Sequence, residues 1–326
     1  MRTMKIVTIV CWVLAALVLT GLIIWFMTGS LFGMWSERWG DNMRFGINLG
    51  GIENLTGPYE KRGSQDIKAE DLDKINIEWV SGDVTIIPYD GDVVIITEYA
   101  QRELNDNEKM YVISNNRTLT IKFTERSIVR RMPSKRLEVH VPQNLMENMN
   151  MLDVSTVSGG VVIENAKPEM LKINTVSGVI GITNIESPFI DAATTSGAIN
   201  IVTVNANKLE ATTVSGAVTI SDAIADALHI GTTSGRITAT GEFNRVNITT
   251  VSGSTTVTNT VVPSNMSISS VSGSIDVYLP DPGELSVSHS SVSGRFTSEI
   301  PVKIQNGAPI NFSTVSGRMT MHSLGD

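Results

Sequence analysis

The sequence predicts an all-β protein, most of which is a parallel β-solenoid: a two-sheet β-helix of about nineteen-residue coils. The dipeptide Ser-Gly recurs nine times from Ser158 to Gly317, and its glycines are separated by 19, 19, 19, 19, 18, 20, 21 and 23 residues. Apolar residues alternate with polar ones on both sides of each glycine, which is typical of two half-buried strands per coil. The composition also favours strands, because Val, Thr, Ser and Gly are plentiful and only 6% of residues are aromatic.

The amino terminus predicts one transmembrane helix. Residues 6–26 are almost wholly apolar, and no charged residue occurs between Lys5 and Glu37. At about 1.5 Å per residue this stretch spans a bilayer core of about 30 Å. It exceeds the 7–15 apolar residues that are typical of a signal peptide, so an anchor in residues 1–27 is favoured over a cleaved signal peptide or a buried helix. Arg2 and Lys5 favour an inside amino terminus. The expected location is therefore a cell membrane, single-pass, with the carboxy-terminal domain extracytoplasmic.

Residues 28–70 are predicted to form a stalk or linker, since they contain several glycines and no sustained period. Residues 71–150 are predicted to hold a first coil around Ser81-Gly82 and then an antiparallel β cap, which a solenoid needs because its first coil otherwise exposes a strand edge. The strand-like runs of this cap are Val93–Tyr99, Met110–Ser114, Leu119–Phe123 and Leu137–Val141.

Residues 151–326 are predicted to form the solenoid of Ser-Gly repeats. Stacked coils pair each strand with its equivalents in the neighbouring coils, which gives two parallel sheets around a thin core. With strands about 4.8 Å apart, nine coils make a rod on the order of 45 Å long.

The Ser-Gly pairs themselves are interpreted as structural corners, because nine equivalent copies do not provide the single neighbourhood that a catalytic serine requires. Glycine allows a positive φ or a close approach to the next coil, and the serine hydroxyls are expected to stack in a hydrogen-bonded ladder. The corner residues are Ser158, Gly159, Ser177, Gly178, Ser196, Gly197, Ser215, Gly216, Ser234, Gly235, Ser252, Gly253, Ser272, Gly273, Ser293, Gly294, Ser316 and Gly317.

No motif for catalysis, for a cofactor or for a metal is found. The sequence lacks a Gly-x-Ser-x-Gly elbow, a Walker loop, a Cys-x-x-Cys pair and a His-Glu-x-x-His helix. The four histidines are scattered, and His289 falls at an inward position where a partly buried structural role is expected. The net charge of −8 argues against nucleic acid as a partner. The protein is therefore predicted not to be an enzyme, with no catalytic residues, no metal site and no cofactor.

A basic cluster in the cap is the one charged feature that suggests a partner. It could meet an acidic envelope polymer or anionic lipid headgroups, or it could be a solvated loop. Its members are Arg126, Arg130, Arg131, Lys135 and Arg136.

Three features together resemble a known family: the early Val80–Ile86 segment, the Leu137–Pro142 run that leads into the repeats, and the serial Ser-Gly-x-apolar-x-apolar coils. They are similar to the bacterial putative-adhesin family of β-strand repeat proteins, domain of unknown function 4097, over about residues 70–322. The resemblance implies a β-strand repeat fold and an adhesin-like role, and it brings no catalytic residues with it.

The function expected from these observations is a membrane-anchored extracytoplasmic β-solenoid that acts as a structural or binding module. Its partners would be the membrane and an envelope polymer or a membrane protein. One alternative is an envelope sensor or regulatory platform. A second is a self-assembling scaffold of the bactofilin kind, forming a homo-oligomer through the carboxy-terminal coil, whose last strand ends near Met321 with little chain left to cover it.

Overall fold

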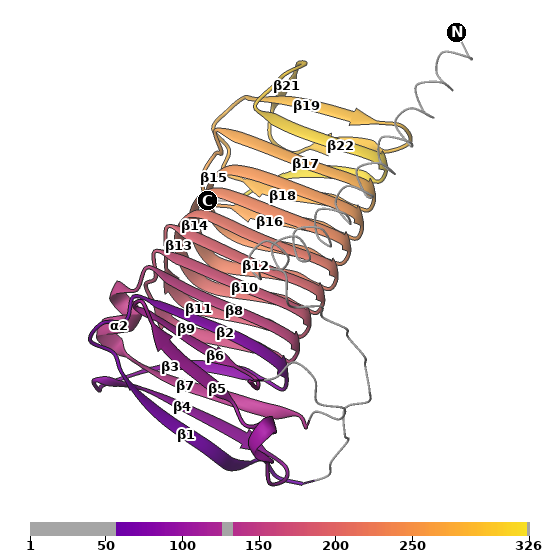
Figure 1. The fold of residues 1–326 in the computed structure, drawn as a ribbon. Coiled ribbons are helices and arrows are strands. Elements are labelled where there is room, and N and C mark those ends of the chain that lie inside the picture. Colours follow the sequence, from indigo (N-terminus) through magenta and orange to yellow (C-terminus); the bar gives the residue numbers. More distant parts are fainter. Residues whose placement is uncertain (1–56, 126–132, 325–326) are drawn as a thin grey trace.

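The computed structural model describes residues 57–125 and 133–324, which form one continuous rod of stacked coils (Figure 1). The predicted anchor in residues 1–27 lies outside the described residues and stays a prediction. Within the described part of the chain, no helix is both long enough and apolar enough to cross a membrane.

Strands make up almost all of the rod, and only two short helical turns interrupt them. The cap and the first coil contain β1 (Glu60–Lys68), β2 (Lys74–Ser81), β3 (Val84–Tyr89), β4 (Val93–Ala100), η1 (Asp106–Glu108), β5 (Tyr111–Asn115), β6 (Thr118–Lys122), β7 (Lys135–Pro142) and α2 (Gln143–Asn148). The solenoid contains β8 (Met151–Ser158), β9 (Val161–Ala166), β10 (Met170–Ser177), β11 (Ile180–Glu186), β12 (Phe189–Ser196), β13 (Ile199–Ser215), β14 (Val218–Ser234), β15 (Ile237–Ser252), β16 (Thr255–Asn259), β17 (Asn265–Ser272), β18 (Ile275–Leu279), β19 (Leu285–Ser291), β20 (Arg295–Ser298), β21 (Val302–Ile304), β22 (Ile310–Ser316) and β23 (Arg318–Ser323).

Two faces of parallel strands run along the rod, as the period predicts. On the first face, β6, β2, β8, β10 and β12 are followed by the second halves of β13, β14 and β15 and then by β17, β22 and β19. On the second face, β7, β3, β9 and β11 are followed by the first halves of β13, β14 and β15 and then by β16, β18, β23 and β20. The predicted parallel β-solenoid is confirmed.

The core follows from the register, because equivalent apolar residues of successive coils lie directly above one another. Leu152, Leu171, Ile190 and Leu209 pair in turn from β8 to β13, and each side chain is fully buried. Every coil thus contributes only a thin apolar layer, and its stability depends on the coils above and below it.

The cap contains the four strands that the sequence predicts, although not all of them are antiparallel. Strand β6 pairs in parallel with β2 and β7 in parallel with β3, so the insertion supplies one more coil. Antiparallel strands then cover this coil, β5 on one face and β4 and β1 on the other.

Strand β1 corrects the predicted boundary of the stalk, because Glu60–Lys68 lies within the segment that was expected to be a linker. It is an edge strand paired only with β4, and a register shift interrupts that pairing between Lys61 and Gly63. Its side chains are mostly exposed and often charged, so it has no apolar alternation that would identify a strand.

At the other end, the order of the coils in space differs from their order in the chain. Strand β22 lies between β17 and β19, and β23 lies between β18 and β20. The expectation that the last coil of the chain ends the rod is therefore wrong, because the coil of β19 and β20 lies at that end.

The composition of the two last coils explains why the coil of β22 and β23 lies inside the rod and the coil of β19 and β20 at its end. The coil of β22 and β23 has apolar residues at its core positions, Ile310, Phe312, Met319 and Met321, and all four are buried. The coil of β19 and β20 has His289 and Ser298 at equivalent positions. The more apolar coil occupies the interior, where it is covered on both sides.

Candidate binding surfaces

The repeated glycines are required by close packing of the backbone. A Cβ atom added at Gly178, Gly197, Gly216 or Gly235 would lie 1.8–2.0 Å from the carbonyl oxygen of the glycine in the preceding coil. These four glycines do not have positive φ in the left-handed range. Their amides donate hydrogen bonds to the serine carbonyl of the next coil, with N–O distances of 3.1–3.2 Å. The prediction that these residues form a corner thus agrees with a steric requirement of the stack.

The hydroxyl file inside the corner belongs mostly to threonines, in contrast to the expected serine ladder. The corner serines from Ser177 onward are exposed. The residues three positions before the corner glycines are threonines in seven coils, all buried, and serines in two, of which Ser270 is buried and Ser291 half-buried. Thr156 Oγ1 lies 2.8 Å from Thr175 Oγ1 and 3.1 Å from the carbonyl oxygen of Gly159. Farther along the rod, the hydroxyl of Thr232 is buried without a hydrogen-bond partner.

Only two members of the predicted basic cluster lie within the described residues, and Lys135 is not at the surface. Arg126, Arg130 and Arg131 lie outside the described residues. The Lys135 side chain is completely buried, whereas that of Arg136 is 55% exposed. Arg136 stacks over the ring of Tyr59, with its guanidinium carbon 4.2 Å from the ring centroid.

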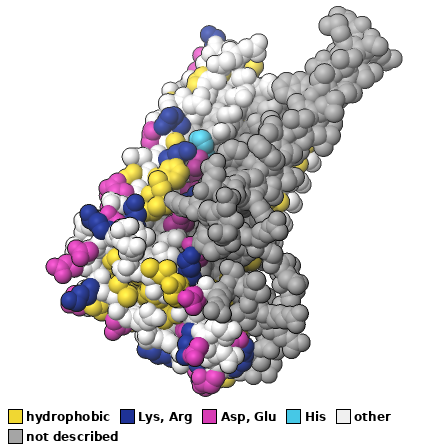
Figure 2. Space-filling model, in the orientation of Figure 1, with side chains coloured by type: hydrophobic (Ala, Val, Ile, Leu, Met, Phe, Trp, Pro, Cys, Tyr) yellow, Lys and Arg dark blue, Asp and Glu magenta, His cyan; other side chains and the backbone are white. Residues whose placement is uncertain are grey.

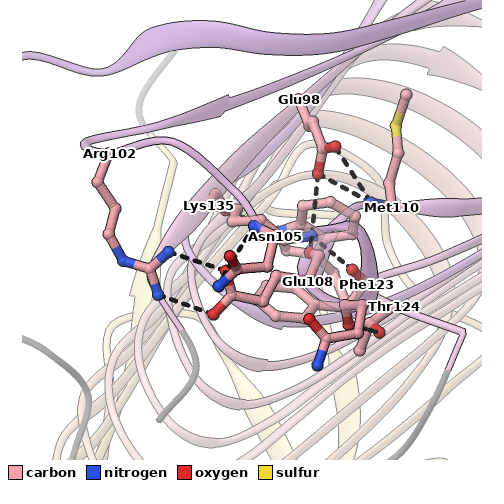
Figure 3. Close-up of polar contacts among 10 residues, drawn as sticks. Glu98, Arg102, Asn105, Glu108, Met110, Phe123, Thr124 and Lys135 are labelled. Atoms are coloured by element: carbon pink, nitrogen blue, oxygen red, sulfur yellow. Dashed lines mark hydrogen bonds and ion pairs between the residues drawn. The ribbon is translucent and has the colours of Figure 1, made fainter. Parts of the chain in front are cut away.

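Lys135 instead holds the interior of the cap together (Figure 3). Its Nζ forms an ion pair with Glu98 at 2.9 Å and donates hydrogen bonds to the carbonyl oxygens of Glu108 and Phe123. The same ammonium lies over the rings of Trp79 and Phe123, at 5.0 and 4.1 Å from their centroids. All three ammonium hydrogens therefore have acceptors, as a buried lysine requires.

A second charged pair lies beside the first. The guanidinium of Arg102 donates two hydrogen bonds of 2.8 Å to the carboxylate of Glu108, and the backbone N–H of Asn105 donates a third. These interactions, chiefly the one with Arg102, lower the pKa of Glu108 to about 2. Burial lowers the pKa of Lys135, and the neighbouring Glu98 carboxylate opposes that shift. The satisfied geometry of both pairs fits a structural role in the cap.

An in-register file of polar and titratable side chains lies on the outward side of the first face, where Asp153 is buried and the other four members are half-buried. It passes from Asp153 through Lys172, Asp191 and Glu210 to His229, one residue per coil. With neighbouring strands about 4.8 Å apart, the file presents a regular row of hydrogen-bonding groups. Figure 2 shows acidic, basic and hydrophobic side chains interspersed over the visible face.

The file leads into a shallow hollow of about 280 Å³ on β14, β15 and β17. Most of its lining side chains are polar, and Arg245 at its edge is paired with Asp226 of the neighbouring coil. The hollow thus offers uncharged hydrogen-bonding groups next to a neutralised cation. Its lining residues are Ala227, His229, Arg245, Val246, Asn247, Asn265 and Ser267.

Within residues 57–125 and 133–324, no cluster of three or more His, Cys, Asp or Glu side chains is arranged to hold a metal ion. His289 lies exposed at the end of the rod, contrary to the expected partial burial, because no further coil of the described chain covers it there.

Sequence reasoning missed the roles of Glu98, Arg102 and Glu108. Lys135 could have been identified as an inward residue, since it shares the parity of Leu137, Val139 and Val141 in β7, all of which are buried. Its partner Glu98 gives the same signal, because it alternates in step with the buried Val94 and Ile96 of β4. Arg102 and Glu108 give none, because they lie between β4 and β5, outside any strand.

The chain belongs to a known family of β-repeat domains. Residues 72–313 match the family Toastrack DUF4097, which covers more than half of the chain. The resemblance found from the motifs is thereby confirmed.

Several solved bacterial proteins have a similar fold. A putative adhesin from Parabacteroides distasonis is 14% identical, covers 82% of this chain and 98% of its own, and has a TM-score of 0.50. A putative adhesin from Bacteroides fragilis is 15% identical, covers 83% and 100% of the two chains, and has a TM-score of 0.46. A second Parabacteroides distasonis protein, described as a putative lipid binding protein, is 18% identical, covers 79% and 96%, and has a TM-score of 0.45. At these identities the likeness concerns the fold alone. No curated protein matches the chain.

Proposed function

We propose that the protein is a membrane-anchored, extracytoplasmic rod that acts as a structural and binding module of the adhesin-like kind, without catalytic activity. The observation that carries this proposal is the outer surface of the first face, where a regular polar file leads into the hollow at Asn247 and Asn265. A rigid parallel sheet holds these groups at fixed spacing, which suits recognition of an extended, hydroxyl-rich envelope polymer.

The predicted anchor sets the orientation of the rod in this proposal. The described chain begins at the cap, next to β1, and the coil of β19 and β20 lies at the opposite end (Figure 1). An anchor in residues 1–27 would therefore hold the cap nearer to the membrane and present the far end to the surroundings.

Protease accessibility tests the orientation. Protease added to intact cells should remove a carboxy-terminal tag from the full chain, and lysis should add little further loss. If the tag resists protease in intact cells and is lost only after lysis, the rod lies inside the cell and the proposal fails.

A binding assay tests the surface. Alanine at both Asn247 and Asn265 should reduce binding of the purified full chain to isolated envelope material by about tenfold, since two hydrogen-bonding side chains are lost. Alanine at both Thr219 and Thr238, in an outward file on the second face, is the matched control and should leave binding unchanged. Equal effects of the two double variants would refute the assignment of this surface.

A further inference from the structure

The end of the rod formed by β19 and β20, here called the open end, leaves a strand edge without a neighbour. β20 pairs with β23 on one side only, and no other described strand lies on its outer side. Strand β21 covers β19 along Leu285–Val287, which is the part of β19 remote from the turn into β20. Residues 288–291 of β19 and the whole of β20 therefore have an unpaired outer edge within the described structure.

The hydrogen bonds between β20 and β23 show which backbone groups of β20 are left at its free edge. Glu299 N–H donates to the carbonyl oxygen of Met321 in β23. Groups of alternate residues in a strand point to opposite edges. The N–H and C=O of Arg295, Thr297 and Glu299 thus point to β23, whereas those of Phe296 and Ser298 point outward.

Rings at core positions also remain uncovered at the open end. His289 stacks on Phe296, with ring centroids 4.8 Å apart and an angle of 18° between the planes. His289 is exposed and Phe296 is half-buried. Phe312, which is equivalent to His289 in the neighbouring coil, is only 1% exposed. Val292, in the turn between β19 and β20, is 52% exposed. The open end thus presents apolar surface beside unpaired backbone groups.

The charges at β20 are arranged symmetrically about Thr297. Arg295 and Thr297 in the strand and Glu299 directly after it are exposed, and they alternate with Phe296 and Ser298. The Glu299 carboxylate already accepts a hydrogen bond from Ser323 N–H and lies 3.1 Å from His322 Nδ1, so a partner's Arg295 would add to these contacts. If a second β20 runs antiparallel to the first about a two-fold axis at Thr297, each Arg295 faces the Glu299 of the other copy. Opposite charges at directly paired positions stabilise an antiparallel sheet.

The same register also satisfies the free backbone groups. Phe296 of one copy then lies opposite Ser298 of the other, and these residues carry the outward N–H and C=O groups. A shift by one hydrogen-bonding step in either direction would place Arg295 opposite Thr297 or Pro301 and lose both charge pairs. Charge and hydrogen bonding therefore select one register.

We propose that two copies of the chain associate end to end at the open end, with β20 of one copy antiparallel to β20 of the other about Thr297. The second copy is the occupant for which the strand is complementary, because an isologous two-fold contact pairs the same surface with itself. One short strand per copy gives a small contact, so the association is reversible and concentration-dependent. The pairing does not depend on the proposed orientation in the membrane.

A charge-reversal experiment tests the register. The chain with Arg295→Glu presents only acidic groups on this edge, and the chain with Glu299→Arg presents only basic groups. Each variant alone should dimerise at least about tenfold more weakly than the wild type, because like charges then face each other. An equimolar mixture of the two variants should recover dimers, since every pair is again complementary. Sedimentation velocity of the full chain in mild detergent, over a concentration series, measures all three.

Arg318→Glu is the matched control, because Arg318 is exposed and pairs in register with Arg295 from the interior strand β23. This reversal should leave the dimerisation constant unchanged, whatever the predicted membrane segment contributes to association. A wild type that stays monomeric at all concentrations would overturn the proposal. So would an Arg318→Glu effect as large as that of Arg295→Glu, or a mixture that stays monomeric.

Disulfide trapping gives an independent readout of the axis. In a background with Cys11→Ala, Thr297→Cys places two thiols at a directly opposed pair, where Cα atoms about 4.5–5.5 Å apart suit a disulfide. Mild oxidation should give covalent dimers of this variant and not of Thr219→Cys, an exposed position in the middle of the rod. Equal trapping of both variants, or trapping of neither, would contradict pairing about Thr297.

Discussion

At one end of the rod, β6 and β7 form a coil that antiparallel strands cover on both faces, whereas at the other end β20 has no partner on its outer side among the described residues. The covering strand β1 carries Lys61 and Arg62 beside a register shift. Such irregular, charged edges resist further pairing. The open end has uncovered rings and a self-complementary row of charges. The same coil architecture is thus closed at the cap and available for contacts at the open end.

The largest expected difference between the ends concerns their corner glycines. A Cβ on Gly82 would lie 2.1 Å from the carbonyl oxygen of Lys135, and one on Gly294 would lie 2.0 Å from that of Gly317. Gly82 also has a φ of +94° and lies between covered coils. Gly82→Ala should cost more than about 4 kcal/mol in the free energy of unfolding. Gly294→Ala should cost about 1–2 kcal/mol, because the last coil can move outward. Urea denaturation followed by circular dichroism measures both, and equal losses would argue against a difference between the ends.

The buried charge of the cap gives the next largest effect. Lys135→Met should destabilise the protein by about 3–5 kcal/mol, because Glu98 is left buried without its counter-ion. Adding Glu98→Gln should recover part of the loss. The neighbouring exposed Arg136→Met is the control and should change stability by less than about 0.5 kcal/mol. If Lys135→Met is tolerated as well as its control, the cap does not depend on this ion pair.

The pH dependence of stability should also come from the cap end. The pKa of Glu108 is lowered from 4.5 to about 2. The ionised carboxylate therefore contributes stability that is fully present above about pH 4.5 and is lost as the pH falls toward 2. The loss should be on the order of 2–3 kcal/mol, and Glu108→Gln should remove this part of the pH dependence. Thermal unfolding measured between pH 2 and 6 is the test, and an unchanged slope in the variant would contradict the assignment. Glu284→Gln, just before β19, is the control. That carboxylate is exposed and has no hydrogen bond or ion pair within the described residues, so the slope should hardly change.

The smallest effect distinguishes two parts of the threonine file. Thr156→Val should cost about 1 kcal/mol, because its hydroxyl is hydrogen-bonded to Thr175 and Gly159. Thr232→Val should be neutral or stabilise the rod by up to about 1 kcal/mol, because its buried hydroxyl has no partner. Calorimetric melting temperatures of the two variants would give the sign of each change in stability, and a clear loss of stability for Thr232→Val would mean that its hydroxyl does have a partner.

Much of the fold could be predicted because its determinants are local and repeated. The spacing of Ser-Gly and the alternation around it give the coil, its corner and its core positions. The strands of the insertion follow from the same alternation, as Leu119 and Ile121 in β6 illustrate, and both are buried.

The order of the last coils could not be predicted in this way, because both coils alternate equally well and only their competition for the interior decides it. The presence of His289 and Ser298 at core positions is the one signal in the sequence that favours the end of the rod for the coil of β19 and β20.

The candidate surfaces were harder to predict, because they depend on residues that are distant in sequence. Five basic residues close together in the chain suggested a patch. In β7, however, alternate side chains point to opposite faces, so Lys135 points inward and Arg136 points outward. The hollow near Asn247 gave no signal, since it arises from side chains of three different coils.

Hydrogen–deuterium exchange of the full chain at two protein concentrations tests the difference between the ends most directly. We predict that the amides of Phe296 and Ser298 exchange quickly at low concentration and become protected at high concentration, while those of Ile96 and Val139 in the cap are protected at both. Slow exchange of the Phe296 and Ser298 amides at low concentration would mean that this end is already covered. Fast exchange of the cap amides would mean that the cap is not closed, and either result would disprove the proposed difference between the ends.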